Sequence, residues 1–405
     1  MAEREIGRLK AAGQLVGADA PRGGSGRSDI ASFIVMDVMR AALAAERAGR
    51  SIIHMEVGQP GTMAPRAARE AARRALDTET LGYTMALGND ALRERIARHY
   101  AEWYGVSVAP ERIAVTCGSS GAFVLAFLAL FDAGDVVALP SPGYPCYRHI
   151  LTALGQPSAL IETGPESGWM PTPDDVVRAA TRDGAKGLLI ASPANPTGTM
   201  ISAERLAGLA RACREHGVVL ISDEIYHGLT YGRAAATALA ESEDAIVINS
   251  FSKYFSMTGW RIGWMVVPQH LVRSVERLAQ NLYISPPAIA QVAALGAFDA
   301  QAELEANRSV YAANRTLLLN ELPKAGFSNF APADGAFYLY CDVSHLSDDA
   351  SGMARKLLDE AGVAVTPGVD FDAERGNRYL RFSYAGTTAD MAEAARRLEA
   401  WARRR

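Results

Sequence analysis

The chain has 405 residues, 49% of them apolar and 21% charged, which is typical of a globular protein with a substantial core. Its net charge of −4 argues against a nucleic-acid-binding surface, which is normally basic. The four cysteines show no C-x-x-C spacing and have no cluster of histidines nearby, so neither a metal site nor a disulfide framework is predicted. A reducing cytoplasm is the expected location.

Residues 1–28 are rich in Gly, Ala and Arg, and they lack the apolar stretch of a signal peptide. We expect a mobile N-terminal arm, which is either a partly disordered tail or a segment that embraces a second subunit. The longest apolar run, AFVLAFLALF at residues 122–131, is about half as long as a membrane span. It predicts a buried helix, and we expect no association with a membrane.

Residues 61–301 alternate between strand-like apolar runs and helical segments. The expected strands are RIAVTC, VVALP, SALIE, GLLIAS, VVLISD, AIVINSF and GWMVV. Apolar strands separated by helices indicate a sheet that is covered on both faces. We therefore predict a three-layer α/β/α large domain with a mainly parallel seven-stranded sheet.

The sequence pattern changes after residue 301, where helical segments are interleaved with the strand-like stretches GAFYLYCDV, GVAVTPG and RYLRFSYA. This pattern predicts a smaller α+β domain at residues 302–405, to which we expect residues 29–60 to contribute the N-terminal part. The length of the chain also exceeds that of one small domain.

Polar residues follow several of the expected strands, and ligands of such sheets gather at the carboxyl ends of the strands. After RIAVTC the turn Gly118-Ser119-Ser120 opens a helix, which suits a phosphate or is simply a helix cap. Asp223 ends another strand and either caps a turn or faces a cationic nitrogen. Asn195 follows a third strand in SPANPTGT, where it is either a hydrogen-bond donor held in position by the loop or a residue that only forms the turn.

The stretch SFSKYFSMTGWRIGW follows AIVIN and contains Lys253, one of only five lysines in the chain. Unlike arginine, a buried lysine loses its proton readily and becomes a nucleophilic amine. Arg261 stands eight positions later and is a phosphate ligand or part of a structural ion pair. A phosphate, a ring nitrogen and a carbonyl that condenses with an amine together describe pyridoxal 5′-phosphate.

These residues resemble the class I/II aminotransferases, fold type I pyridoxal-phosphate enzymes with the aspartate-aminotransferase-like fold. The matching elements are S-x-S-K followed by G-x-R-x-G in the lysine stretch, N-P-T-G in SPANPTGT and D-E-x-Y in SDEIY, in the same order over residues 50–385. The resemblance implies an enzyme that moves an amino group between an L-amino acid and a 2-oxo acid through a pyridoxal/pyridoxamine phosphate cycle.

The resemblance also implies roles for single residues. Lys253 would bind the cofactor covalently and move a proton, Asp223 would face the ring nitrogen, and Tyr226 and Asn195 would bond the ring oxygen. The remaining cofactor-binding residues would be Gly118, Ser119, Ser120, Tyr144, Ser250, Ser252 and Arg261. Arg381 would bind the substrate α-carboxylate, with Gly58 and Asn195 beside it. Tyr83 would reach the cofactor of the neighbouring subunit, so a homodimer is expected.

The substrate is not named by these motifs. No second cationic residue for a distal substrate carboxylate can be assigned, and the aromatic residues of GAFYLY and Tyr283 leave room for an apolar side chain. The main alternative is a pyridoxal-phosphate-dependent lyase on the same scaffold, of the C–S β-lyase or aminocyclopropane-carboxylate-synthase type. A ligand-sensing module fits poorly, because the arm is short and the chain acidic. A dehydrogenase fits poorly too, because no G-x-G-x-x-G follows the first strand.

Overall fold

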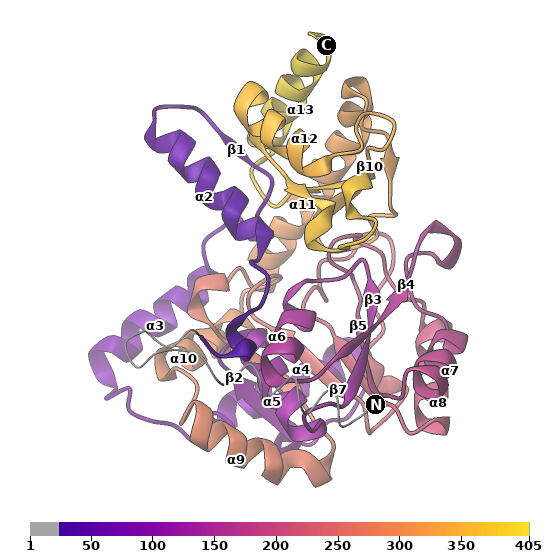
Figure 1. Ribbon diagram of the computed structural model, residues 1–405. Helices are drawn as coiled ribbons and strands as arrows, with labels where there is room; N and C mark the ends of the chain where they lie inside the picture. Colours follow the sequence, from indigo (N-terminus) through magenta and orange to yellow (C-terminus); the bar gives the residue numbers. More distant parts are fainter. Residues whose placement is uncertain (1–23, 405) are drawn as a thin grey trace, which may run out of the picture.

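The computed structural model describes residues 24–404. It shows an upper and a lower group of helices and strands that contact each other in the middle of the molecule (Figure 1). The lower group contains a seven-stranded sheet in the order β2-β8-β7-β6-β5-β3-β4. Its strands are β2 (Ile113–Thr116), β3 (Val136–Ser141), β4 (Ser158–Glu162), β5 (Ala185–Ala191), β6 (Val219–Asp223), β7 (Ile246–Ser250) and β8 (Gly263–Val266). Every strand expected from the sequence in this region is present.

Only β8 among these strands runs against its neighbours. It pairs antiparallel with both β2 and β7, whereas the other pairs are parallel. Two successive antiparallel pairings return β2 to the common direction, so the residues after β2, β5, β6 and β7 all emerge at one edge of the sheet. This edge carries the site described below.

Both faces of the sheet are buried under helices. Along β5, Leu188 and Ile190 pack into one core while Leu189 between them packs into the other, as the two-residue period of a strand requires. The helices of this group are α3 (Arg66–Thr78), α4 (Asp90–Tyr104), α5 (Gly118–Leu130), α6 (Cys146–Leu154), α7 (Pro173–Arg182), α8 (Ala203–Glu215), α9 (Val272–Leu282) and α10 (Ala288–Ala297). The predicted three-layer α/β/α architecture with a mainly parallel sheet is confirmed.

The upper group is built around a four-stranded sheet of order β12-β13-β10-β9, with β1 paired to β11 beside it. The strands are β1 (Ile53–His54), β9 (Asn329–Phe330), β10 (Tyr338–Asp342), β11 (Val363–Ala364), β12 (Thr366–Pro367) and β13 (Tyr379–Ser383). The helices are α2 (Ile34–Arg47), α12 (Ala350–Lys356) and α13 (Thr388–Ala402), and the long α11 (Gln301–Glu321) leads into the group from below (Figure 1).

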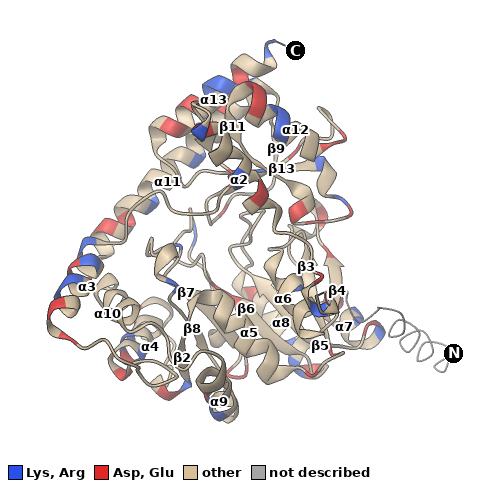
Figure 2. Cartoon of the chain, turned by 60° about the vertical axis from the view of Figure 1, so that its left-hand side comes forward, with Lys and Arg blue, Asp and Glu red and all other residues tan. Residues whose placement is uncertain are grey.

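The parallel pairing of β1 with β11 joins the segment before residue 60 to the end of the chain. This contact supports the proposed division into residues 29–60, 61–301 and 302–405, which stays a proposal. Residues 1–23 of the expected arm lie outside the described residues. In the view of Figure 2, acidic and basic residues are mixed along outer helices such as α3 and α13, and the central strands carry few of either. Within residues 24–404, no helix is both long enough and apolar enough to cross a membrane.

Candidate active site

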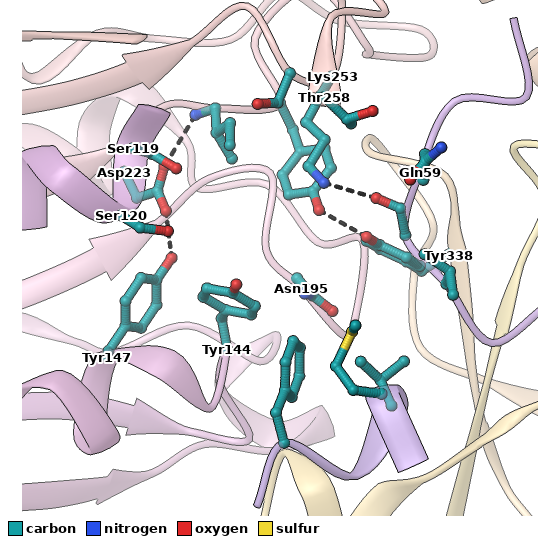
Figure 3. Close-up of a pocket in the computed structure, with 18 of the residues that line it drawn as sticks. Gln59, Ser119, Ser120, Tyr144, Tyr147, Asn195, Asp223, Lys253, Thr258 and Tyr338 are labelled. Carbon is teal, nitrogen blue, oxygen red and sulfur yellow. Dashed lines mark hydrogen bonds between the residues drawn. The ribbon is translucent and has the colours of Figure 1, made fainter. Parts of the chain in front are cut away.

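A cavity of about 600 Å³ opens at the carboxyl edge of the large sheet, where the two groups of elements meet (Figure 3). It brings together most of the residues singled out in the sequence. Those that line it are Gly58, Ser119, Ser120, Tyr144, Asn195, Asp223, Tyr226, Ser252, Lys253, Arg261 and Arg381. They come from segments spread over more than 300 residues of sequence, so the fold alone assembles them.

Lys253 points into the middle of the cavity, where its Nζ donates a hydrogen bond to the main-chain oxygen of Gly58 at 2.6 Å. The pKa of Lys253 is lowered to about 8, mainly by burial and also by the positive charge of Arg381, while the negative charge of Asp223 acts in the opposite direction. An amine with this pKa exists partly as the free base near neutral pH. Lys253 can therefore act as a nucleophile or as a base.

Asp223 ends β6 and is almost fully buried. Its Oδ1 accepts a hydrogen bond from the main-chain nitrogen of Ile225 at 3.0 Å, and its Oδ2 accepts one from the hydroxyl of Tyr147 (Figure 3). Burial raises the pKa of Asp223, and although both hydrogen bonds oppose this effect, the pKa is about 6. A buried carboxylate of this kind is suited to a cationic partner in the cavity.

A pair of tyrosines lines the side of the cavity that lies across from Asp223 (Figure 3). The hydroxyls of Tyr226 and Tyr338 lie 2.6 Å apart, and both side chains are buried. The position of Tyr338 also explains why residue 58 is a glycine, because a Cβ on Gly58 would come within 1.8 Å of the Tyr338 hydroxyl oxygen. Glycine is therefore the one residue that fits beside this ring.

The turn after β2 faces Arg261. A Cβ on Gly118 would lie 2.6 Å from Nη2 of Arg261, and Gly118 has a φ of +74°, so glycine is required here on both counts. Ser119 and Ser120 sit in the first turn of α5, whose leading N–H groups have no partner within the helix. Free N–H groups, hydroxyls and a guanidinium form a donor set that suits a phosphate.

Arg381 on β13 is 1% exposed and lies between two aromatic rings. Its guanidinium carbon is 4.4 Å from the ring centre of Tyr338 and 4.7 Å from that of Phe371. Nη1 donates to Oδ1 of Asn195 at 2.8 Å, and Nη2 donates to the main-chain oxygen of Glu56. Arg381 thus joins three separate segments at the wall of the cavity.

Three of the residues predicted to bind cofactor or substrate lie outside the cavity lining. Gly118 stands directly behind Arg261, as described above. Ser250 lies behind Ser252, to which its hydroxyl donates a hydrogen bond of 2.9 Å. Tyr83 is 84% exposed on the outer surface of the described chain.

Several lining residues were not anticipated from the sequence. Tyr147 lies in the first turn of α6, three positions after Tyr144, which stands just before this helix. Its place in SPGYPCY, the stretch that contains Tyr144, is the signal that could have found it. Tyr338 belongs to GAFYLY, but its bond to Tyr226 joins residues 112 positions apart. Three others, Ile225, Thr258 and Gly259, lie within the matching stretches but had no role assigned to them. The remaining ones are Phe33, Val35, Met36, Val57 and Gln59. Tyr283 is not part of the lining.

The family model for "Aminotransferase class I and II" matches residues 50–398, most of the chain. The chain belongs to this family. It is 47% identical to the valine–pyruvate aminotransferase of Mycobacterium tuberculosis over 379 residues, which cover 93% of this chain and 97% of that protein. It is also 37% identical to the aspartate/prephenate aminotransferase of Thermus thermophilus, over 88% of this chain and 92% of that one.

Solved structures of other aminotransferases have the same fold. A crystal structure of an aminotransferase from Mycobacterium tuberculosis superposes with a TM-score of 0.92 at 46% identity, over 95% of this chain and 100% of that one. A putative aminotransferase from Silicibacter pomeroyi gives a TM-score of 0.89 at 55% identity, with the same coverage. This aminotransferase is therefore a pyridoxal-phosphate-dependent transaminase, and the alternative of a lyase is not favoured.

The described residues fit pyridoxal phosphate at both ends. The turn at Gly118 leaves space beside Arg261, and the hydrogen-bond donors around Arg261 suit the phosphate of the cofactor. The buried carboxylate of Asp223 suits the protonated ring nitrogen. The amine of Lys253 lies in the same cavity, as attachment to the cofactor's aldehyde requires.

Replacing Tyr147 by Phe removes the hydroxyl that lowers the pKa of Asp223. The carboxyl group then binds its proton at a higher pH, so the acid limb of the pH profile of kcat/KM should move upward by roughly one unit. Steady-state rates of the holoenzyme across pH measure the shift. Tyr231→Phe is the matched control, because the hydroxyl of Tyr231 donates to the main-chain oxygen of Ala336 instead. A downward shift, or equal shifts in both variants, would contradict this role.

Proposed function

We propose that this aminotransferase takes its amino group from an L-amino acid with an apolar side chain and one carboxylate. The observation that carries the proposal is the small number of positively charged side chains in the cavity. Among the described residues that line it, the basic ones are Lys253, Arg261 and Arg381, and each has a task in the reaction or in cofactor binding. A second substrate carboxylate would be left without a cation, which is costly in a buried site.

The rest of the lining supports the same substrate class. Phe33, Val35, Met36, Val57 and Ile225 give the cavity an apolar wall. The relative from Mycobacterium tuberculosis bears the name valine–pyruvate aminotransferase, which agrees with an apolar donor and a small 2-oxo acid as acceptor. The relative from Thermus thermophilus is named for aspartate and prephenate, so both substrate classes occur among relatives of this chain.

We assign the cofactor contacts by the chemistry of each group. Lys253 would hold the cofactor covalently, Asp223 would keep its ring nitrogen protonated, and Tyr144 would stack on the ring. Asn195 and Tyr226 would donate to the ring oxygen. The phosphate would be held by Gly118, Ser119, Ser120, Ser250, Ser252 and Arg261, together with Tyr83 of the partner subunit.

The substrate would be held by Arg381, whose planar guanidinium suits a carboxylate, with Gly58 and Asn195 alongside. Pyridoxal phosphate supplies, when bound, a ring that accepts the electron pair left at the substrate Cα. Nζ of Lys253 would take up the proton released from the substrate Cα and carry it to C4′ of the cofactor. Its lowered pKa of about 8 makes the free amine available for this transfer near neutral pH.

A panel of single amino acids tests the substrate class. The holoenzyme is mixed with valine, threonine or aspartate, and conversion of the cofactor to its pyridoxamine form is followed by absorbance. We expect kcat/KM for valine to exceed that for aspartate by about a hundredfold or more, with threonine, which has the shape of valine, in between. Equal or faster conversion by aspartate would overturn the proposed substrate class.

We also propose a homodimer with composite active sites. Tyr83 and Met85 are 84% and 67% exposed, and Thr84 between them contacts Ser285, whose neighbour Ile284 is 51% exposed. An exposed apolar patch of this kind favours a protein interface. Light scattering should give twice the mass of one chain, and a monomer at working concentration would contradict the proposal. The proposed cytoplasmic location rests on the four cysteines, all of which are free thiols in the structure.

A further inference from the structure

The first turn of α2 and the residue before it, Phe33, form an apolar wall of the cavity. Phe33, Val35 and Met36 all line it, and Val35 is buried. The ring of Phe33 meets the ring of Tyr144 edge to face, with the ring centres 5.8 Å apart. The position of this turn therefore decides how much room an apolar substrate side chain has.

One carboxylate from the far end of the chain holds this turn in place. Oδ1 of Asp370 accepts a hydrogen bond from the main-chain nitrogen of Ile34 at 3.1 Å, and Oδ2 accepts one from Val35 at 3.2 Å. The first N–H groups of a helix have no partner within the helix, and a carboxylate there also opposes the helix dipole favourably. The preceding residue, Phe33, has no side-chain acceptor to replace it. Asp370 thus serves as the N-terminal cap of α2 from 336 positions away.

The turn that carries Asp370 also touches the arginine assigned to the substrate carboxylate. Phe371, the next residue, stacks its ring under the guanidinium of Arg381 at 4.7 Å. On the other side, Nη2 of Arg148 donates to the main-chain oxygen of Asp370 at 2.6 Å. One short turn therefore connects Arg381, the large group of elements and the apolar wall.

We propose that Asp370 is a positioning residue that determines substrate specificity, because it sets the location of the apolar wall relative to Arg381. This inference rests on the proposed apolar amino donor. Asp370 is 1% exposed and, within the described chain, lies behind the cavity lining instead of in it. It acts through Val35 and its neighbours and touches neither substrate nor cofactor.

The test uses the holoenzyme with Asp370→Asn, which keeps the shape of the side chain but replaces one acceptor oxygen by an N–H donor. We expect the ratio of kcat/KM for valine to kcat/KM for alanine to fall by roughly tenfold, mainly through a higher KM for valine. Hydrogen exchange of the amides of Ile34 and Val35 should become faster in the same protein. Asp370→Ser keeps a single short acceptor and serves in the same assays if Asp370→Asn does not fold.

Asp372→Asn is the matched control. Asp372 lies in the same turn and is also buried, but its carboxylate accepts from Arg375 and from the main-chain nitrogen of Glu374. It should leave the valine-to-alanine ratio and the exchange of the α2 amides unchanged. A similar change in the control would show general loosening of the turn and would overturn the inference.

An unchanged ratio in the Asp370 variants, with or without faster exchange, would likewise overturn it. The outcome is distinguishable from failure of the proposed function. A wild-type enzyme that prefers aspartate would refute the apolar donor before any variant is made, whereas a normal preference for valine that survives the loss of Asp370 refutes the positioning role alone.

Discussion

Replacing Lys253 by Ala should reduce turnover by about ten-thousandfold or more, because under the proposed assignment the variant lacks both the amine that holds the cofactor and the base that carries the proton. The cavity keeps its phosphate donors and Asp223, so the variant should still bind pyridoxal phosphate, but without a covalent bond and with an altered visible spectrum. Rates of conversion with valine, followed by absorbance, measure the effect.

Lys186→Ala is the control for Lys253, since Lys186 is an exposed lysine on β5. It should keep the wild-type rate and spectrum. Thermal unfolding of both variants should show that neither has lost its fold. Transamination by Lys253→Ala within tenfold of wild type would remove Lys253 from the role assigned to it.

Replacing Asp223 by Asn should lower kcat by about a hundredfold to a thousandfold with a smaller change in KM. The amide has the shape of the carboxylate but no charge, so it no longer favours a proton on the ring nitrogen of the cofactor. The hydrogen bonds around the phosphate are untouched, and the variant should still bind pyridoxal phosphate. Single-turnover rates separate the loss in chemistry from any loss in substrate binding.

The pH dependence of wild-type activity also tests the role proposed for the carboxyl group of Asp223. The role proposed for Asp223 requires its ionised form, and burial raises the pKa of Asp223 to about 6 before the cofactor is bound. A cationic ring nitrogen stabilises the ionised form, so the activity of the holoenzyme should fall only at a pH below that value. Asp244→Asn, at an exposed position, is the control and should behave as wild type. Unchanged turnover in Asp223→Asn would contradict the assignment.

The large sheet could be predicted from the sequence because its strands are short apolar runs that bury both faces. VVLISD shows the pattern well: Leu220 and Ile221 pack into opposite cores, and Asp223 follows where the strand ends. Several of the predicted cofactor residues, such as Asp223 and Lys253, came from the same feature, since polar residues after parallel strands converge at one edge. Most of the predicted residues line one cavity, while their individual roles stay proposals.

The contacts that join distant segments could not be predicted. Nothing in the sequence indicates that Asp370 caps a helix that begins at Ile34, or that the hydroxyl of Tyr338 meets that of Tyr226. Such pairs depend on how the two groups of elements pack, not on local periodicity. The apolar wall from α2 was missed for this reason, because its residues look like an ordinary helix start when read alone.

The most direct test of the central claim is to find which residue carries the cofactor. The holoenzyme is treated with borohydride, which makes the bond between cofactor and amine permanent, and its peptides are then mapped by mass spectrometry. The account predicts that the added mass of the reduced cofactor lies on Lys253 alone. Label on another of the five lysines, or no label in an enzyme that binds pyridoxal phosphate and transaminates, would contradict it.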